Sequence, residues 1–157
     1  MTGFFDDEIR DLMDMVLRDM YMLDKEIEDN FGFTSSRIYT LLAFCRKEVM
    51  KMRELSDEMS LKTSTMTRMI DNLVKEGLVE RINDPNDRRL VIVRLTIKGK
   101  VLANNIKEYK EKSLNSILDN IEKEGKEEMV SSLKILLDAF GKFRPKYMIF
   151  TLVFVLF

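Results

Sequence analysis

Residues 61–81 read LKTSTMTRMIDNLVKEGLVER, and residues 82–100 read INDPNDRRLVIVRLTIKGK. In the first stretch Thr63 is a candidate N-cap, and the apolar residues behind it recur at helical spacing: Met66, Met69, Ile70, Leu73 and Val74. Gly77 is suited to end this helix because glycine adopts positive φ readily. After Gly77 the period of the apolar residues changes to two, which predicts β-strands.

The second stretch predicts a β-hairpin. Residues 78–83 and 90–96 alternate and are rich in β-branched side chains, and the second run places Val91, Val93 and Leu95 on one face. Between the runs lies DPNDRR (84–89), a cluster of turn-forming residues that ends in two arginines. A capped helix followed by a hairpin with a basic tip is the order of elements in a winged helix-turn-helix.

Helical periodicity dominates the rest of the chain. It predicts a helix over 5–27, a second from the N-cap Thr34 to about 47 with Ile38, Leu41, Leu42 and Cys45 on its buried face, and a short one over 52–59. Two long helices follow residue 97, with a break near Glu124-Gly125. The apolar faces of the long helices exceed what a lobe of about 65 residues can cover, so we expect a second subunit to cover some of them.

Composition narrows the function. The chain has 157 residues, 34% of them charged, with no histidine and one cysteine. It shows no glycine-rich phosphate loop and no nucleophile motif with a partner base. We therefore expect no catalytic residue, no bound metal and no cofactor. A lone cysteine fits a reducing compartment, and the acidic start is not typical of a signal peptide, so we expect a cytoplasmic, non-membrane protein.

Basic charge is concentrated in the middle of the chain. The net charge is −1, yet residues 60–100 hold nine basic and five acidic residues, against 17 and 22 in the remainder. A local excess of this kind is the electrostatic footprint of a nucleic-acid-binding surface.

The predicted helix after residue 62 offers the side chains that double-stranded DNA requires. The major groove admits one α-helix, and a guanidinium such as that of Arg68 can bind a guanine edge in bidentate fashion. Arginines at the hairpin tip can enter the narrow minor groove. The candidate DNA-binding residues are Lys62, Thr63, Ser64, Thr65, Thr67, Arg68, Arg88 and Arg89. The alternative is an ordinary solvated helix face, with the tip arginines paired to Asp84 or Asp87.

The same stretch resembles a known family. LSDEMSL (55–61), STMTRMIDNL (64–73) and EGLVER (76–81) are similar to the helix-turn-helix of the MarR/SlyA transcriptional regulators. DPNDRR (84–89) followed by VRLTIKG (93–99) resembles the wing signature of that family. These motifs cover about 50 residues, and the helix layout extends the likeness through Phe143. Ser56 and Ser60 stand where the family usually has alanine and glycine.

The resemblance implies a mostly α fold with a small β-hairpin wing (α+β). It implies a single domain over 1–157, with a winged helix-turn-helix over 34–100, dimerisation helices over 1–30 and 101–143, and an extension over 144–157. It further implies a homodimer on a pseudo-palindromic operator, with Arg89 as the minor-groove arginine and Asp87 as its brace. Such proteins usually repress transcription and release DNA when a small phenolic or lipophilic compound, or an oxidant, acts on the dimer.

Two features bear on a sensor. Cys45 is the only thiol, and a buried free cysteine is usually inert. The peroxide sensors of the family carry their cysteine early in the first helix, where this chain has LMDM (12–15). Twelve methionines are unusual, and flexible thioethers suit a pocket for varied apolar ligands, although they also serve as core filler. The candidate pocket residues are Met13, Leu17, Met20 and Leu42.

Other functions stay open. The first alternative is a constitutive architectural or adaptor winged-helix protein without a ligand, and the second is a thiol redox sensor that uses Cys45. The segment YMIFTLVFVLF (147–157) is apolar except for Thr151, and at eleven residues it is about half the length of a membrane span. Our hypothesis is that it adds apolar area to a dimer interface, with a packed extension of its own subunit or an artefactual sequence as alternatives.

Overall fold

The computed structural model describes residues 2–84 and 91–143 of the chain. Its elements follow one another as α1 (Thr2–Phe31), α2 (Ser35–Arg46), β1 (Val49–Lys51), α3 (Met52–Glu58), α4 (Thr63–Lys75), β2 (Val79–Asn83), β3 (Val91–Leu95), α5 (Ile97–Leu118) and α6 (Lys123–Phe143). The mostly helical fold with a β-hairpin is confirmed. Asp87, Arg88, Arg89 and residues 144–157 lie outside the described residues.

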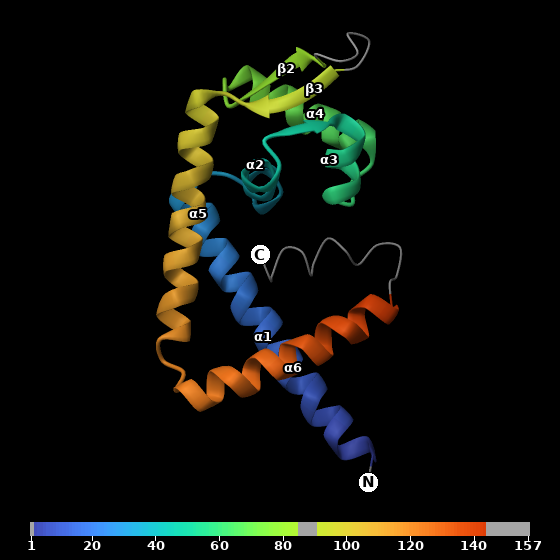
Figure 1. The fold of residues 1–157 in the computed structure, drawn as a ribbon, viewed down its shortest axis with the longest axis vertical. Coiled ribbons are helices and arrows are strands. Elements are labelled where there is room, and N and C mark those ends of the chain that lie inside the picture. Colours follow the sequence, from blue (N-terminus) through green and yellow to red (C-terminus); the bar gives the residue numbers. More distant parts are fainter. Residues whose placement is uncertain (1, 85–90, 144–157) are drawn as a thin grey trace.

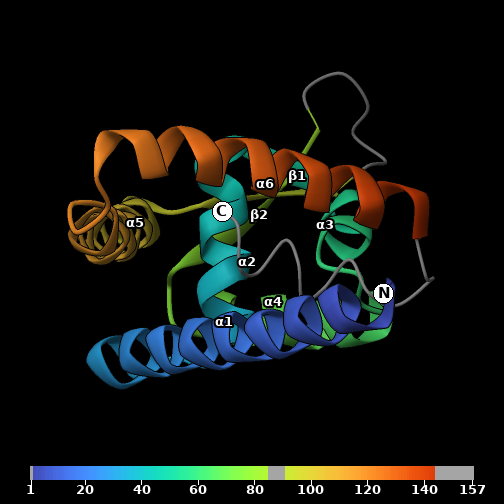
Figure 2. The same cartoon turned by 90° about the horizontal axis from the view of Figure 1, so that it is seen from below.

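The elements form one lobe and a set of long helices that lead away from it. In Figure 1, α2, α3, α4 and the sheet gather at one end, while α1 and α5 extend from this lobe and α6 crosses α1 at a distance from it. Figure 2, the view from below, shows α1 and α6 running in opposite directions, with α5 seen end-on. The winged helix-turn-helix and its flanking helices are thus distinct in space.

One apolar core holds the lobe together. It combines Ile27 of α1 with Leu41 and Phe44 of α2, the inner face of α4, and Ala103 and Ile106 of α5. On α4 the predicted residues Met66, Ile70 and Leu73 are fully buried. The prediction was wrong for Val74, which is 36% exposed, because it lies at the edge of the apolar face, where α4 leaves the core.

The sheet has three strands in the order β1-β3-β2. The hairpin β2/β3 was predicted, and its register pairs Val79 with Leu95 and Asn83 with Val91. The three-residue strand β1 was not predicted, and it pairs antiparallel with β3, Met50 facing Val93. A run this short shows no alternation that a sequence pattern can detect, so only pairing with a distant strand reveals it.

Several predicted boundaries shift. Helix α1 continues through Asn30 and Phe31 before Gly32 takes a φ of 69°. Helix α4 begins at Thr63, so Lys62 and not Thr63 holds the N-cap position, and its side chain makes no cap hydrogen bond. The break between the last two helices falls before Lys123, and Gly125 lies inside α6, because helix α5 already ends at Leu118.

Thr34 holds the predicted N-cap position of α2, but a different residue satisfies the helix start. The Glu28 carboxylate accepts hydrogen bonds from the backbone N–H and the hydroxyl of Ser35, while Lys25 donates to the same carboxylate. The Lys25 ammonium and the Ser35 donors together hold the pKa of Glu28 at about 2. This carboxylate therefore ties the end of α1 to the start of α2 in its ionised form.

Ser60 occupies a left-handed conformation with a φ of 50°, in the turn between α3 and α4. Glycine adopts this conformation without the clash of a Cβ atom. We expect Ser60→Gly to raise the free energy of unfolding by about 0.5–1 kcal/mol, the net of lost strain and gained unfolded-state entropy. Urea unfolding at fixed protein concentration measures this. Ser116→Gly, inside α5, is the control and should lower stability, since glycine is a poor helix former. Equal losses for both variants would refute strain at Ser60.

Much of the apolar surface lies on the helices away from the lobe. On α1, Phe5, Ile9, Leu12 and Val16 share one face, and each is more than half exposed. On α6, Ile135 is 73% exposed and Val130 is 50% exposed. No helix of the described part of the chain is both long and apolar enough to cross a membrane.

Candidate nucleic-acid interface

Helix α4 presents a polar face opposite the core. Its inner residues are buried, and the side chains on its outer face are exposed: Thr63, Ser64, Thr65, Thr67 and Arg68. The N-cap Lys62 is exposed beside them. Among the described residues Arg68 makes no ion pair, so its guanidinium is available to a ligand. The predicted DNA-binding residues on this helix are thus brought together on one surface.

Ion pairs fix α4 against the lobe. Asp71 of α4 accepts from Arg81 of β2 at 2.6 Å, which joins the helix to the hairpin. Glu76, just after α4, pairs with Arg37 of α2, and the Arg37 guanidinium stacks over the Phe33 ring at 4.5 Å. Exposed ion pairs add little stability, but these two restrict how α4 can turn relative to its neighbours.

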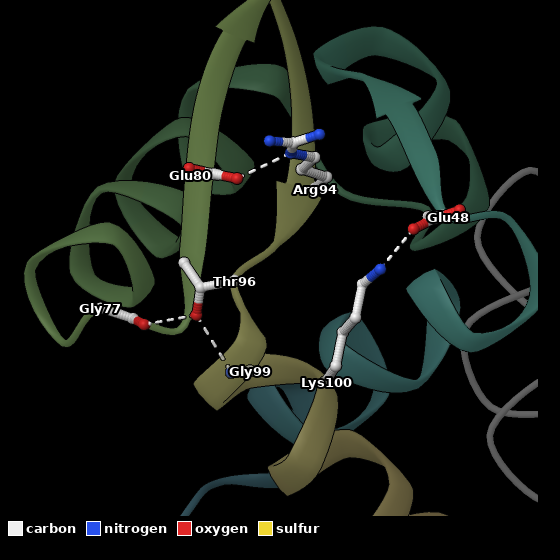
Figure 3. A network of polar contacts seen from close by, with 7 residues as sticks. All are labelled: Glu48, Gly77, Glu80, Arg94, Thr96, Gly99 and Lys100. Carbon is white, nitrogen blue, oxygen red and sulfur yellow. Dashed lines mark hydrogen bonds and ion pairs between the residues drawn. The ribbon is translucent and has the colours of Figure 1, made fainter.

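A second polar network joins the hairpin to α5 (Figure 3). The Thr96 hydroxyl donates to the Gly77 carbonyl at 2.6 Å and accepts from the Gly99 N–H at 3.1 Å, so it caps α5 and holds the end of α4. Across the hairpin, Arg94 donates to Glu80 at 2.7 Å. Lys100 of α5 pairs with Glu48, just before β1, and lowers the pKa of that carboxyl.

The described basic residues between 60 and 100 therefore divide into two groups. One group is occupied inside the protein: Arg81, Arg94 and Lys100 pair with carboxylates, and Lys98 donates to the Glu76 carbonyl. The other group has no ion pair among the described residues: Lys62, Arg68 and Lys75. The local charge excess predicted from the sequence is thus reduced by internal pairing, and what remains free in the described part lies on α4.

The candidate pocket residues separate into two places. Met13 and Leu17 line an apolar groove of about 630 Å³ between α1 and α6, with Ile9, Leu133, Leu136 and Phe140 among the other walls. Met20 is half-buried and Leu42 is buried in the core of the lobe, and neither lines this groove. Of the four predicted residues, Met13 and Leu17 therefore line this groove, while Met20 and Leu42 do not.

The prediction that Cys45 faces inward was wrong. Cys45 is exposed, and Phe44 takes the buried position beside it. Loss of hydration nevertheless raises the pKa of the Cys45 thiol, outweighing the opposing effect of Lys107 and Arg46. The reactive form of a cysteine is its thiolate, so this environment does not activate Cys45.

Sequence patterns missed the residues that brace the interface. Arg37 and Asp71 resemble ordinary surface charges because their partners, Glu76 and Arg81, belong to other elements. The signal available in the sequence was the presence of acidic residues such as Asp71 and Glu76 within the basic stretch 60–100. Their presence is compatible with ion pairs but does not say which residues pair.

Comparison with known proteins gives a consistent result. Residues 39–91 match the sequence model of the MarR family. The chain is 25% identical over 113 residues to the HTH-type transcriptional regulator YdgJ and 30% identical over 96 residues to YsmB, both of Bacillus subtilis. The matches cover 72% and 61% of this chain but 65% and 66% of those relatives, just under two thirds of their lengths. A solved structure of a mutant MarR from Escherichia coli, complexed with operator DNA, superposes with a TM-score of 0.65, at 27% identity, over 84% of this chain and 92% of that one.

Proposed function

We propose that the chain is a transcriptional regulator of the MarR family and that it binds specific double-stranded DNA as a homodimer. The observation that carries the proposal is the outer face of α4, which lies on a helix braced by two ion pairs. There small polar side chains surround Arg68, which has no ion-pair partner among the described residues. A face of this kind matches what a major groove accepts. The relatives are named as regulators, so we propose regulation rather than catalysis.

The wing completes the proposed interface. From the family motif in residues 84–89 we propose that Arg89 enters the minor groove, that Arg88 lies beside it, and that Asp87 braces one of the two. These three residues lie outside the described part of the structure, in which β2 ends at Asn83 and β3 begins at Val91.

The exposed faces of α1 and α6 support a homodimer. Large apolar side chains left about half exposed or more on two adjoining helices are typical of a subunit interface. A two-fold dimer would place two copies of α4 on successive major grooves, about one helical turn apart, and therefore read a pseudo-palindrome. We also propose that residues 147–157 add apolar area to this interface.

We expect Arg68→Ala to weaken binding to the preferred duplex by about 5- to 150-fold, because one bidentate contact to a base contributes about 1–3 kcal/mol of discrimination. The probe is the duplex that the wild-type protein selects from a randomised library, and fluorescence anisotropy at several salt concentrations gives the affinity. Binding to an unselected duplex should fall less. Arg18→Ala is the matched control, since it removes an arginine from α1, and it should bind like the wild type.

The salt series separates the two proposed roles. Loss of a phosphate contact lowers the slope of log affinity against log salt by about one, while loss of a base contact alters sequence preference. Arg89→Ala should therefore weaken all duplexes alike. An Arg68→Ala protein with unchanged affinity and preference would show that α4 is not the reading helix, and a wild-type protein that selects no duplex would overturn the proposed function.

We further propose that the protein represses transcription and is released by a small lipophilic or aromatic compound. The apolar groove lined by Met13 and Leu17 and the family resemblance support this. A ligand shifts DNA affinity only through its different affinities for the two states of the dimer. A screen should yield compounds that raise the melting temperature and lower DNA affinity together. Compounds that only stabilise would favour the constitutive architectural alternative.

A further inference from the structure

A chain of polar groups, two of them buried and the third half-buried, links three helices at the edge of the lobe. The Tyr39 hydroxyl of α2 donates to Asp24 Oδ1 of α1 at 2.7 Å and accepts from Lys110 Nζ of α5 at 2.9 Å. The Lys110 ammonium also lies 4.5 Å from the centre of the Tyr39 ring. Tyr39 is 6% exposed and Lys110 is 4% exposed. Lysine is almost never this buried unless it is paired. The position of Lys110 therefore depends on its polar partners and not on apolar packing alone.

The charges of Asp24 and Lys110 offset the cost of burial only while the two side chains stay close to each other. Burial raises the pKa of Asp24 and lowers the pKa of Lys110, and each charge opposes the shift of the other. Burial and the hydrogen bond to Asp24 raise the pKa of Tyr39, so the phenol stays protonated and its hydroxyl keeps donating to Asp24. A buried polar group that loses its hydrogen-bond partner destabilises the protein. Apolar contacts are less directional, so small displacements of the helices cost less there.

The position of the cluster gives it a role. On α5 the buried residues are Gly99, Ala103, Ile106 and finally Lys110, and beyond it Ile117 and Leu118 are exposed. On α1, Asp24 lies in the segment that packs on the lobe through Leu23 and Ile27, while residues 5–21 are exposed or half-exposed. Both helices therefore leave the lobe at this cluster, and Figure 1 shows that each extends away from the lobe.

We propose that Asp24, Tyr39 and Lys110 form a polar joint that fixes the direction in which α1 and α5 leave the winged lobe. The neighbouring hydrogen bonds between α5 and α1 restrain the direction of these helices less strongly. Tyr109, one residue before Lys110, also bridges to α1 through Asn30 and Glu26, but these hydrogen bonds lie at the exposed surface, where water can replace them. A consequence that rests on the proposed function is that the joint sets the separation of the two α4 helices, and so the spacing of half-sites.

A distance measurement tests the joint without DNA. In a Cys45→Ser background, spin labels at Asp14→Cys on α1 and Lys75→Cys on α4 report the angle between helix and lobe by pulsed electron resonance. Labelled protein is diluted with excess unlabelled protein so that distances within one subunit dominate. We expect one narrow distribution for the otherwise wild-type chain and for Tyr109→Phe, and a broadened or shifted one for Tyr39→Phe. Melting curves identify a variant that fails to fold, in which case Asp24→Asn replaces it with the same expectation.

If these residues only stabilise the fold, the variants should have a lower melting temperature and an unchanged distance distribution. That outcome for both Tyr39→Phe and Asp24→Asn would overturn the proposed joint.

A second experiment measures binding to the selected duplex after its centre has been lengthened or shortened by one base pair. Tyr39→Phe should reduce the preference for the selected spacing by about 5-fold or more, the lower end of typical coupling between sites. A wild-type protein that selects no duplex would refute DNA binding, while the distance arm would still decide the joint. Unchanged spacing preference with altered distances would refute only the consequence for half-sites.

Discussion

The variant Gly99→Ala is expected to lose more than about 3 kcal/mol of unfolding free energy, although it replaces a helical glycine with the best helix former. A Cβ atom at Gly99 would lie 1.9 Å from the carbonyl oxygen of Leu78 and 2.9 Å from its carbon. Both are backbone atoms, so no side-chain rotation relieves the overlap. The same Leu78 carbonyl accepts a hydrogen bond from the Thr96 N–H at 3.0 Å. Helix α5 must therefore move away from the hairpin, and the Thr96 cap and the core contacts of Ala103 move with it.

Gly77→Ala isolates the other reason for glycine at this junction. Gly77 has a φ of 69° and no atom within 4 Å of the added Cβ, so its cost is backbone strain alone, about 1 kcal/mol. Urea unfolding of the wild type and both variants, at one protein concentration, measures the difference. A Gly99→Ala protein as stable as Gly77→Ala would mean that α5 adjusts to the overlap at little cost. We predict that Gly99→Ala loses more unfolding free energy than Gly77→Ala.

The contrast between these glycines shows what sequence patterns can and cannot reveal. Gly77 was recognised as the end of α4 because a local rule, an apolar period followed by glycine, applies there. The need for glycine at residue 99 depends on an approach between backbones that are twenty-one residues apart, and no local pattern encodes it. The same holds for strand β1, which exists only because β3 pairs with it.

Helices and the hairpin were predictable because their periodicity is local, and so was the outer face of α4. Errors occurred at the edges of faces, where one residue decides between inside and outside. Cys45 and Val74 both lie there, and both are exposed. The braces of the candidate interface and the Asp24–Tyr39–Lys110 joint could not be predicted, since Asp24 and Lys110 are far apart in the chain and are linked through Tyr39 of α2.

Leu12→Lys is expected to weaken the proposed homodimer by at least about 100-fold. Leu12 is 55% exposed in the isolated chain and lines the groove between α1 and α6, together with Val16 on the same face. Burial of a leucine side chain contributes about 1.5–3 kcal/mol, and a two-fold dimer carries the change twice. A lysine at this position must in addition lose its hydration or force the helices apart.

Asp11→Lys is the matched control, because it places the same side chain at the neighbouring position, on the opposite side of α1 from the groove. Light scattering and sedimentation on dilution give the dissociation constants, and circular dichroism checks that helical content is retained. Truncation after Arg144 in the same series measures what residues 147–157 add, and we expect a weaker dimer. If Leu12→Lys and Asp11→Lys dissociated alike, the face of α1 would not be the interface. In the proposed complex two lobes hold the DNA together, so loss of the dimer should remove the gain from linked binding, typically about 10²- to 10⁴-fold. Leu12→Lys should therefore lose affinity for the selected duplex although every residue proposed to contact DNA is unchanged.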